Sequence, residues 1–298
     1  MIKNILLDTD IGIDCDDAVA LAVLLNLQKA ERCFIAGITV STTRGGASAS
    51  VRAICGYYGV EVPPIGRYNG TLLPADVKNV YAKGLAEKFG CSDAADDAVA
   101  VLRGKLASVA GRCTVVAIGP LSNIAALLRS QPDAFSPLTG VEIMREKAEA
   151  LYFMGGCFDG TIGEEFNIVQ DISAAQTVAA FCPVPMVCIP FESAADILTG
   201  KDVFCESGNP VALAEERLFA AEFPGVSPMA GRSSWDPVTA YLAVCGTERA
   251  ELSAPGQLIV EGNGRTRFVP KEGGMFRYVA GCDKKFLEEE IERLSLRG

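Results

Sequence analysis

The sequence predicts an α/β fold in which a mostly parallel central sheet is flanked by helices. Short apolar runs rich in β-branched residues alternate with longer helical stretches, a pattern typical of parallel strands joined by crossover helices. Of the 298 residues, 49% are apolar, which is enough to bury a large core within one domain. We therefore expect a single domain over residues 1–298, with a small antiparallel extension near the C-terminus.

The alternating part of the chain assigns strands and helices in turn. The expected strands are Asn4–Asp8, Phe34–Val40, Thr114–Ile118, Leu151–Met154 and Pro185–Ile189. The expected helices are Asp17–Leu27, Ser48–Tyr58, Leu121–Leu128, Ser173–Ala180 and Asp236–Val244. Residues 18–27 are apolar on nearly every side of their helix, so this helix should be buried.

The C-terminal part of the chain has a different pattern. Gln257–Val260 and Thr266–Val269 flank the turn residues Gly262-Asn263-Gly264, which predicts an antiparallel hairpin. Lys284–Leu296 is rich in charge and is expected to form a solvent-facing helix.

Charge and composition exclude several classes of function. With 27 basic and 37 acidic residues the formal charge is −10, and no segment forms a basic face for nucleic acid. The first apolar run is too short for a signal peptide and no later run reaches membrane-spanning length, so we expect a cytoplasmic protein without membrane contact. The chain has no histidine, which excludes imidazole as a catalytic base or a zinc ligand.

Five carboxylates follow the first strand, where ligands of parallel sheets bind. They are Asp8, Asp10, Asp14, Asp16 and Asp17. Such charges converge between a buried strand and a buried helix only if a cation neutralises them or some are protonated. An all-oxygen set of ligands suits Ca²⁺ or Mg²⁺. Gly12 would let the loop turn tightly. The last two of the five carboxylates, Asp16 and Asp17, lie where a helix N-terminus favours negative charge.

This run is also compatible with two other interpretations. The first is an acidic N-cap on an exposed helix, which disagrees with the apolar helix that follows. The second is a phosphatase of the haloacid-dehalogenase type, with Asp8 as the nucleophile and Asp10 as its acid/base partner. That chemistry requires Thr or Val where Gly12 stands, and a downstream Lys and acidic pair that the chain does not offer.

Four segments resemble the inosine–uridine-preferring nucleoside hydrolase family. They are DTDIGIDCDDAVAL at the start (family signature DxDxGxDDxxAL), VVAIGPLSNIAALL at 115–128 (GPLTN), MGG…EEFNIVQDISAA at 154–175 (EFN) and SSWDPVTAYL at 233–242 (late Asp helix). Their order and spacing agree across most of the chain. The resemblance implies a Rossmann-like nucleoside hydrolase fold and cleavage of ribonucleosides to ribose and free base.

The resemblance also implies a calcium site and a catalytic base. Asp10, Asp17 and Asp236 would bind Ca²⁺ together with the main-chain carbonyl of Ile118. Asp10 would take the proton from a calcium-bound water, and that water would attack the anomeric carbon. The transition state should resemble an oxocarbenium ion, which a negatively charged pocket favours.

The implied substrate-binding residues surround the ribose. They are Asp16, Glu165, Asn167 and Asp236 for the hydroxyls, Met154 beside the sugar, and Phe166 within the same segment as Glu165 and Asn167. Hydroxyls bound by fixed carboxylates and an amide make the site specific for ribose, because an analogue lacking one leaves these groups unpaired. Taken alone, residues 165–167 would be a surface turn and Asp236 an ordinary helix N-terminal residue.

Two departures from the family pattern leave assignments open. The chain has two extra residues between Asp10 and the aspartate pair. Alignment on the helix assigns the pair to Asp16 and Asp17 and is preferred, whereas alignment on the strand would use Asp14. Where the family has an Asn before the EFN segment, this chain offers Asp159 or Thr161 as a ribose contact.

Trp235 replaces a histidine of the inosine–uridine-preferring members. Trp235-Asp236 resembles the purine-specific branch, in which a Trp stacks on the base, and a stacked purine can take its proton from solvent. The sequence therefore predicts a preference for purine nucleosides. Alternatively, Trp235 packs the start of its helix, and the proton donor comes from the loops within Thr71–Asp96 or Glu206–Arg232.

The expected function is hydrolysis of a small-molecule nucleoside by a homodimer or homotetramer. A second interpretation keeps the fold and changes the substrate to another N-ribosyl compound. A third is a catalytically silent protein that binds ribose or a metal ion.

Overall fold

The computed structural model describes residues 2–297, and most of its strands belong to one sheet. The strands of this sheet are β1 (Lys3–Thr9), β2 (Cys33–Val40), β3 (Ile65–Arg67), β4 (Asp96–Asp97), β5 (Cys113–Ala117), β6 (Ala148–Met154), β7 (Met186–Ile189), β10 (Ala250–Leu252), β11 (Gly256–Val260), β12 (Thr266–Pro270) and β13 (Phe276–Cys282). A separate antiparallel pair joins β8 (Leu198–Thr199) to β9 (Arg232–Ser233).

The 11-stranded sheet has the order β12-β11-β13-β7-β6-β5-β1-β2-β3-β4, with β10 paired to β13. From β13 to β4 every neighbouring pair is parallel. The strands β10, β11 and β12 pair antiparallel at one end. The predicted parallel sheet with an antiparallel extension near the C-terminus is thus confirmed, and the hairpin lies where the sequence placed it.

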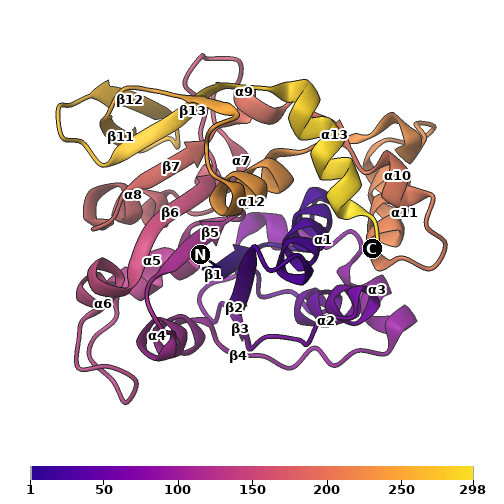
Figure 1. The fold of residues 1–298 in the computed structure, drawn as a ribbon, viewed down its shortest axis with the longest axis horizontal. Coiled ribbons are helices and arrows are strands. Elements are labelled where there is room, and N and C mark those ends of the chain that lie inside the picture. The colour runs from indigo at the N-terminus through magenta and orange to yellow at the C-terminus, as the bar shows by residue number, and fades with distance from the viewer. Residues whose placement is uncertain (1, 298) are drawn as a thin grey trace.

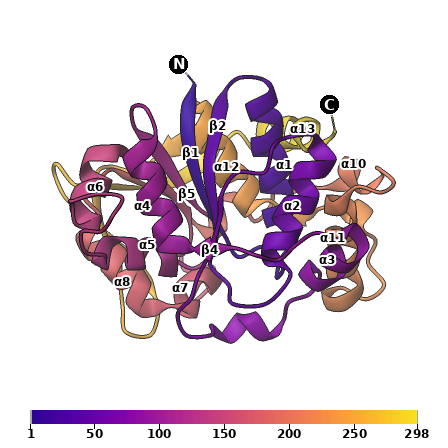
Figure 2. The same ribbon diagram turned by 90° about the horizontal axis from the view of Figure 1, so that it is seen from below.

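Helices cover both faces of the sheet (Figures 1 and 2). One face carries α1 (Asp16–Lys29), α2 (Ala47–Tyr58), α12 (Trp235–Cys245) and α13 (Lys284–Ser295), and the other carries α4 (Ala98–Ser108), α5 (Ser122–Arg129), α6 (Gly140–Lys147) and α8 (Ile172–Phe181). The short or peripheral helices are α3 (Ala82–Phe89), α7 (Phe166–Gln170), α9 (Phe191–Ala194), α10 (Lys201–Phe204), α11 (Pro210–Glu222) and the 3-10 turns η1 (Pro74–Val77) and η2 (Pro228–Ala230). Each face of the sheet has its own buried apolar core.

Helix α1 is buried as predicted. Every residue from Asp16 to Leu25 is buried, and the helix packs against α12 and α13. Its central place fixes the direction in which its N-terminal aspartates point.

The prediction that the C-terminal helix faces solvent was wrong for one side of the helix. Leu287, Ile291 and Leu294 are buried against the core, while Lys285 and Glu289 on the same helix are exposed. The apolar residues recur at helical spacing within a charged segment, so α13 is amphipathic rather than solvent-facing all round. Within residues 2–297, no helix combines the length and the apolar character needed to cross a membrane.

The register of the strands brings distant segments to one edge of the sheet. Asp8 in β1 pairs with Ala117 in β5, and Ala117 pairs with Phe153 in β6. Met154 pairs with Ile189 at the end of β7. These strands therefore end at the same level, and the segments that follow them meet where parallel sheets bind ligands.

Candidate active site

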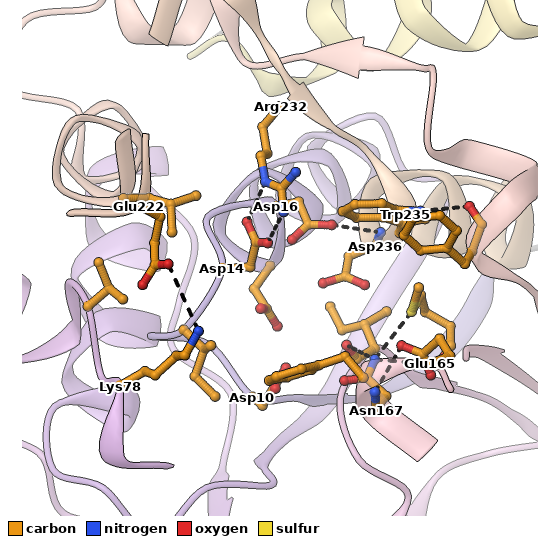
Figure 3. Close-up of a pocket in the computed structure, with 18 of the residues that line it drawn as sticks. Asp10, Asp14, Asp16, Lys78, Glu165, Asn167, Glu222, Arg232, Trp235 and Asp236 are labelled. Carbon is orange, nitrogen blue, oxygen red and sulfur yellow. Dashed lines mark hydrogen bonds and ion pairs between the residues drawn. The ribbon is translucent and has the colours of Figure 1, made fainter. Parts of the chain in front are cut away.

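A cavity of about 440 Å³ opens at this edge of the sheet. The residues singled out in the sequence that line it are Asp10, Asp14, Asp16, Asp17, Ile118, Met154, Glu165, Phe166, Asn167, Trp235 and Asp236. Figure 3 shows the acidic side chains in the middle of this cavity, with Glu165 and Asn167 on one side and Lys78 and Glu222 on the other. Four segments far apart in the sequence thus form one site.

The loop between β1 and α1 owes its shape to Gly12. Its φ angle of 126° favours glycine, and a Cβ atom there would lie 2.8 Å from Cβ of Ala82. Its carbonyl accepts a 2.7 Å hydrogen bond from the backbone N–H of Val80. The loop then enters α1 at Asp16, so Asp16 and Asp17 occupy the first helical turn.

Three buried carboxylates converge at the N-termini of α1 and α12. One oxygen each from Asp16, Asp17 and Asp236 lies within 4.8 Å of the other two. Asp16 accepts a 3.3 Å hydrogen bond from the backbone N–H of Asp236, and Asp17 accepts one from the hydroxyl of Thr9. Asp10 is buried beside them and lines the same cavity. This arrangement has the spacing and the oxygen ligands of a divalent-cation site.

The electrostatics of this cluster also favour a cation. Burial, with the charge of Asp14 added, raises the pKa of Asp16 to about 8. Burial and the neighbouring carboxylates raise the pKa values of Asp10, Asp17 and Asp236 well above the usual range. Ionised carboxylates this close at low dielectric need a positive charge between them. Within the described residues, the ion pair that this loop makes joins Arg232 to Asp14. It does not involve the three converging carboxylates.

Gly119, in the GPLSN segment, makes room for Asp10. A Cβ atom at Gly119 would lie 2.9 Å from Oδ1 of Asp10 and 2.7 Å from Oγ of Ser41. Any larger residue would therefore displace the carboxylate. This close approach explains why a glycine follows the strand β5.

Asp8 lies beneath the cavity and does not line it. It is fully buried, and its Oδ1 accepts hydrogen bonds from Thr39 Oγ1 at 2.5 Å and Asn123 Nδ2 at 2.7 Å. Burial raises the pKa of Asp8 to about 7. A side chain held in this way cannot reach a substrate, which argues against the phosphatase interpretation with Asp8 as nucleophile.

The EFN segment forms the opposite wall of the cavity. Glu165 caps α7, accepting hydrogen bonds from the backbone N–H groups of Asn167 (2.8 Å), Ile168 (3.1 Å) and Gly156 (3.0 Å). Burial raises its pKa to about 7. Nδ2 of Asn167 donates to the carbonyl of Ile118 at 3.3 Å. These residues are an ordered part of the cavity and not a surface turn.

Trp235 both lines the cavity and packs against its neighbours. Its indole N–H donates a 2.8 Å hydrogen bond to the carbonyl of Phe191. The rings of Phe191 and Trp235 are stacked, with centroids 5.2 Å apart and planes inclined by 29°. The guanidinium of Arg232 lies 4.9 Å from the Trp235 ring centroid. A base that stacks on this indole must share it with these two side chains.

Asp14 and Asp159, the alternative ribose contacts, have other partners. Asp14 lies in the cavity wall and binds Arg232 through two hydrogen bonds. Asp159 lies outside the cavity lining and accepts hydrogen bonds from the backbone N–H and the hydroxyl of Thr161. Asp16, which alignment on the helix assigns to the aspartate pair, lies in the converging group with Asp17 and Asp236, whereas Asp14 is paired with Arg232.

Several lining residues carried no recognisable signal in the sequence. They are Ile13, Lys78, Val80, Ile162, Glu164, Val169, Phe191, Leu218, Glu222, Phe223 and Arg232. Lys78 lies within Thr71–Asp96, and Glu222 and Arg232 lie within Glu206–Arg232, the two segments named as alternative sources of a proton donor. Lys78 and Glu222 face each other with their charged atoms 3.9 Å apart.

The parallel sheet and the acidic cavity at its edge define an α/β enzyme that acts on a small molecule. The chain belongs to the inosine-uridine preferring nucleoside hydrolase family, whose sequence profile matches residues 5–275. Family membership supports hydrolysis of the N-glycosidic bond of nucleosides and metal dependence, and the acidic cluster is a possible site for that metal.

Solved structures with this fold include three informative relatives. An inosine-uridine preferring nucleoside hydrolase from Bacillus anthracis has 19% identity and a TM-score of 0.74, with 99% of each chain covered. A purine-preferring ribonucleoside hydrolase from Gardnerella vaginalis has 20% identity and a TM-score of 0.74, with 98% of each chain covered. The type III effector XopQ, complexed with adenosine diphosphate ribose, has 18% identity and a TM-score of 0.71, covering 99% of this chain and 92% of its own. No curated protein matches the sequence significantly.

Proposed function

We propose that this enzyme hydrolyses ribonucleosides, with a preference for purines, and uses Asp10 as the general base beside a calcium ion. The observation that carries the proposal is the convergence of Asp16, Asp17 and Asp236 within 4.8 Å, next to a cavity of about 440 Å³. A nucleoside fits a cavity of this size, which lies within the range of small-molecule sites.

The residues present fit a calcium ion. Asp10, Asp17, Asp236 and the carbonyl of Ile118 offer only oxygen atoms, the ligands that Ca²⁺ prefers. Asp17 and Asp236 belong to the group with metal-ligand spacing, and Asp16 completes that group, so Asp16 is a further candidate ligand. When bound, calcium would neutralise the cluster and lower the pKa of the attacking water.

The ribose end of the cavity lies at the EFN wall. Three backbone N–H groups hold the Glu165 carboxylate in one orientation, and its remaining lone pairs can accept ribose hydroxyls. Asn167 and Met154 lie beside it, and the amide of Asn167 is within 3.3 Å of the Met154 sulfur. These fixed groups favour a sugar that has its hydroxyls.

The reaction follows from the charges around the sugar. A water oxygen bonds to the anomeric carbon while Asp10 takes the proton. The bond from that carbon to the base nitrogen breaks, and its electron pair leaves with the base. Positive charge develops on the ribose ring, and the surrounding carboxylates stabilise it.

The purine preference is tested with a panel of nucleosides and Trp235→Ala. We expect kcat/KM to be higher for inosine, guanosine and adenosine than for uridine and cytidine, because a purine stacks better and accepts a proton from water. Stacking contributes about 1–3 kcal/mol per base, so the substitution should reduce the inosine-to-uridine ratio roughly 5- to 150-fold.

The matched control is Trp235→Phe, which keeps an aromatic ring against Phe191 and should keep most of the preference. A wild-type enzyme that prefers uridine, or an equal loss for both substrates in Trp235→Ala, would show that Trp235 is a packing residue. A cytoplasmic location and a homodimeric or homotetrameric assembly stay predictions from the sequence, and a role in nucleoside salvage would follow from the proposed reaction.

A further inference from the structure

Arg232 places a positive charge in the wall of the acidic cavity. It lies in β9, three residues before Trp235, and its side chain is largely buried. Its Nε and Nη2 donate hydrogen bonds of 3.1 and 2.5 Å to the two oxygens of Asp14. Its guanidinium lies 5.3 Å from the ring centroid of Phe223 and 4.9 Å from that of Trp235. Two rings and one carboxylate therefore hold the guanidinium in place.

The partner of Arg232, Asp14, lies in a loop that has two more residues than the family signature. Those residues lengthen the loop between Asp10 and Asp16, and Asp14 within it points at Arg232 (Figure 3). Within the described residues, the hydrogen bonds of the Arg232 side chain go to Asp14. A guanidinium has five N–H groups. Asp14 thus orients Arg232 and leaves donors of the same planar group for a ligand.

Arg232 lies in the part of the cavity away from the proposed ribose end. Glu165 and Asn167 mark the ribose end, and Figure 3 shows Arg232 and Asp14 away from them, in the wall that leads toward Glu222. The surrounding apolar side chains Ile13, Leu218 and Phe223 suit the faces of a base. A ribose at the EFN wall therefore directs its base toward this guanidinium.

The reaction requires stabilisation at this end. When the bond between the anomeric carbon and the base breaks, the electron pair leaves on the base as negative charge. A histidine could donate a proton there, but the chain has none. An arginine keeps its proton at any working pH, so it acts by charge and hydrogen bonding.

We infer that Arg232, oriented by Asp14, is a catalytic residue that stabilises the departing base as an anion. Water protonates the base after the bond is broken, while the proton of the attacking water goes to Asp10. The inference rests on the proposed function, because it concerns the leaving group of that reaction. Arg232 thus stabilises the leaving base by its charge, where a proton donor would do so by protonating it.

The test compares two leaving groups in Arg232→Met. Inosine leaves a poorly stabilised anion, whereas a nitrophenyl riboside leaves a phenolate that needs little help. Removing one such donor typically costs about 10²–10³ in kcat. We expect a loss of this size for inosine and a loss of no more than about threefold for the nitrophenyl riboside. Arg232→Lys should lose less on inosine, and Asp14→Asn should show the same selective loss to a smaller extent.

The matched control is Arg249→Met. Arg249 likewise lies over an aromatic ring, 4.2 Å from the centroid of Phe286, and pairs with Asp283 at 3.3 Å, but it lies on the surface near α13. Its removal should leave both rates unchanged. If Arg232→Met does not fold, as judged by circular dichroism, the same comparison of inosine with the nitrophenyl riboside is made with Arg232→Lys and Arg232→Gln.

Equal losses for both substrates would overturn the inference, since a structural role has no reason to distinguish leaving groups. A change in KM with kcat retained would overturn it as well, because Arg232 would then only bind the base. A wild-type enzyme that cleaves neither substrate contradicts the proposed function itself, and is thereby distinguished from failure of the Arg232 role alone.

Discussion

Two regions of this protein bury charge, and they do so in opposite ways. In the first, Arg103 of α4 is only 1% exposed, yet its guanidinium is fully engaged by its own chain. It binds both carboxylate oxygens of Asp133 at 2.6 and 3.1 Å, the hydroxyl of Ser130 at 2.9 Å, and the carbonyls of Ser136 and Leu138 at 3.1 and 2.8 Å. This network is electrostatically complete without any ligand.

In the second region, the carboxylates Asp10, Asp16, Asp17 and Asp236 are as deeply buried but carry charges of the same sign. Asp17 accepts a hydrogen bond from Thr9, and Asp16 accepts one from the backbone N–H of Asp236. These bonds compensate only part of the negative charge of the cluster. Burial of charge therefore does not by itself mark a functional site. A network completed by its own chain stabilises the fold, whereas one completed only by a cation indicates function.

Asp10→Asn should have the largest effect, which is a loss of catalysis. The amide keeps the volume of the side chain but cannot accept the proton of the attacking water. Loss of a general base typically lowers kcat about 10²–10⁴-fold. The melting temperature should be retained, because the substitution removes one of several mutually repelling charges. A loss of kcat below about tenfold would assign the base role to Asp14 or Asp16 instead.

The next effect concerns stability, in Arg103→Met. The substitution leaves the carbonyls of Ser136 and Leu138 without their donor, while Asp133, whose side chain is one-third exposed, can bind water instead. We expect a cost of about 1–3 kcal/mol in the free energy of unfolding. The folded fraction should keep the kcat of the wild type, since Arg103 lies on the opposite face of the sheet from α1. Urea denaturation measures the change. Arg293→Met removes an exposed pair with Glu290 and should cost less than about 1 kcal/mol; a similar cost for both variants would contradict the account.

The last effect concerns the dependence of stability on pH. Burial raises the pKa of Asp8 and of Glu165 to about 7 and that of Asp16 to about 8, whereas exposed carboxyls have pKa values of about 4. The folded protein then binds more protons than the unfolded chain between about pH 4 and pH 8, so its stability falls as pH rises through this window.

Metal-free protein should therefore melt at a lower temperature at about pH 8 than at about pH 5, by roughly 2–4 °C for each kcal/mol lost. Calcium should reduce the difference, because it favours the ionised cluster. The Arg103 network behaves oppositely: hydrogen bonds from Arg103 lower the pKa of Asp133, so its contribution is lost only as pH falls below about 4. A melting temperature that rises from pH 5 to pH 8 without calcium would contradict this assignment.

The sequence predicted the features that depend on local pattern. The parallel strands, the buried helix α1 and the carboxylate loop could all be recognised because each is encoded within a short stretch, Asp8 to Asp17 in the last case. The position of the EFN segment followed from a resemblance in order and spacing. The structure adds that Glu165 is oriented by backbone N–H groups, which no pattern of residue types reveals.

The part of the cavity around Arg232 could not be predicted. Arg232 meets Asp14 across more than two hundred residues, and Phe223 and Glu222 come from the end of α11. Nothing local distinguishes such residues from ordinary loop and helix residues. The amphipathic character of α13 was missed for a related reason, since its charged residues outnumber the apolar ones that face the core.

Metal removal and replacement in a hydrolysis assay tests whether the buried aspartates need calcium for catalysis. Purified enzyme is treated with EDTA, its metal content is measured, and the release of base from inosine is followed before and after calcium is added back. We predict that activity is lost with the metal and returns with calcium, because the buried aspartates require a cation to act together. Full activity in protein shown to be free of metal would contradict the account.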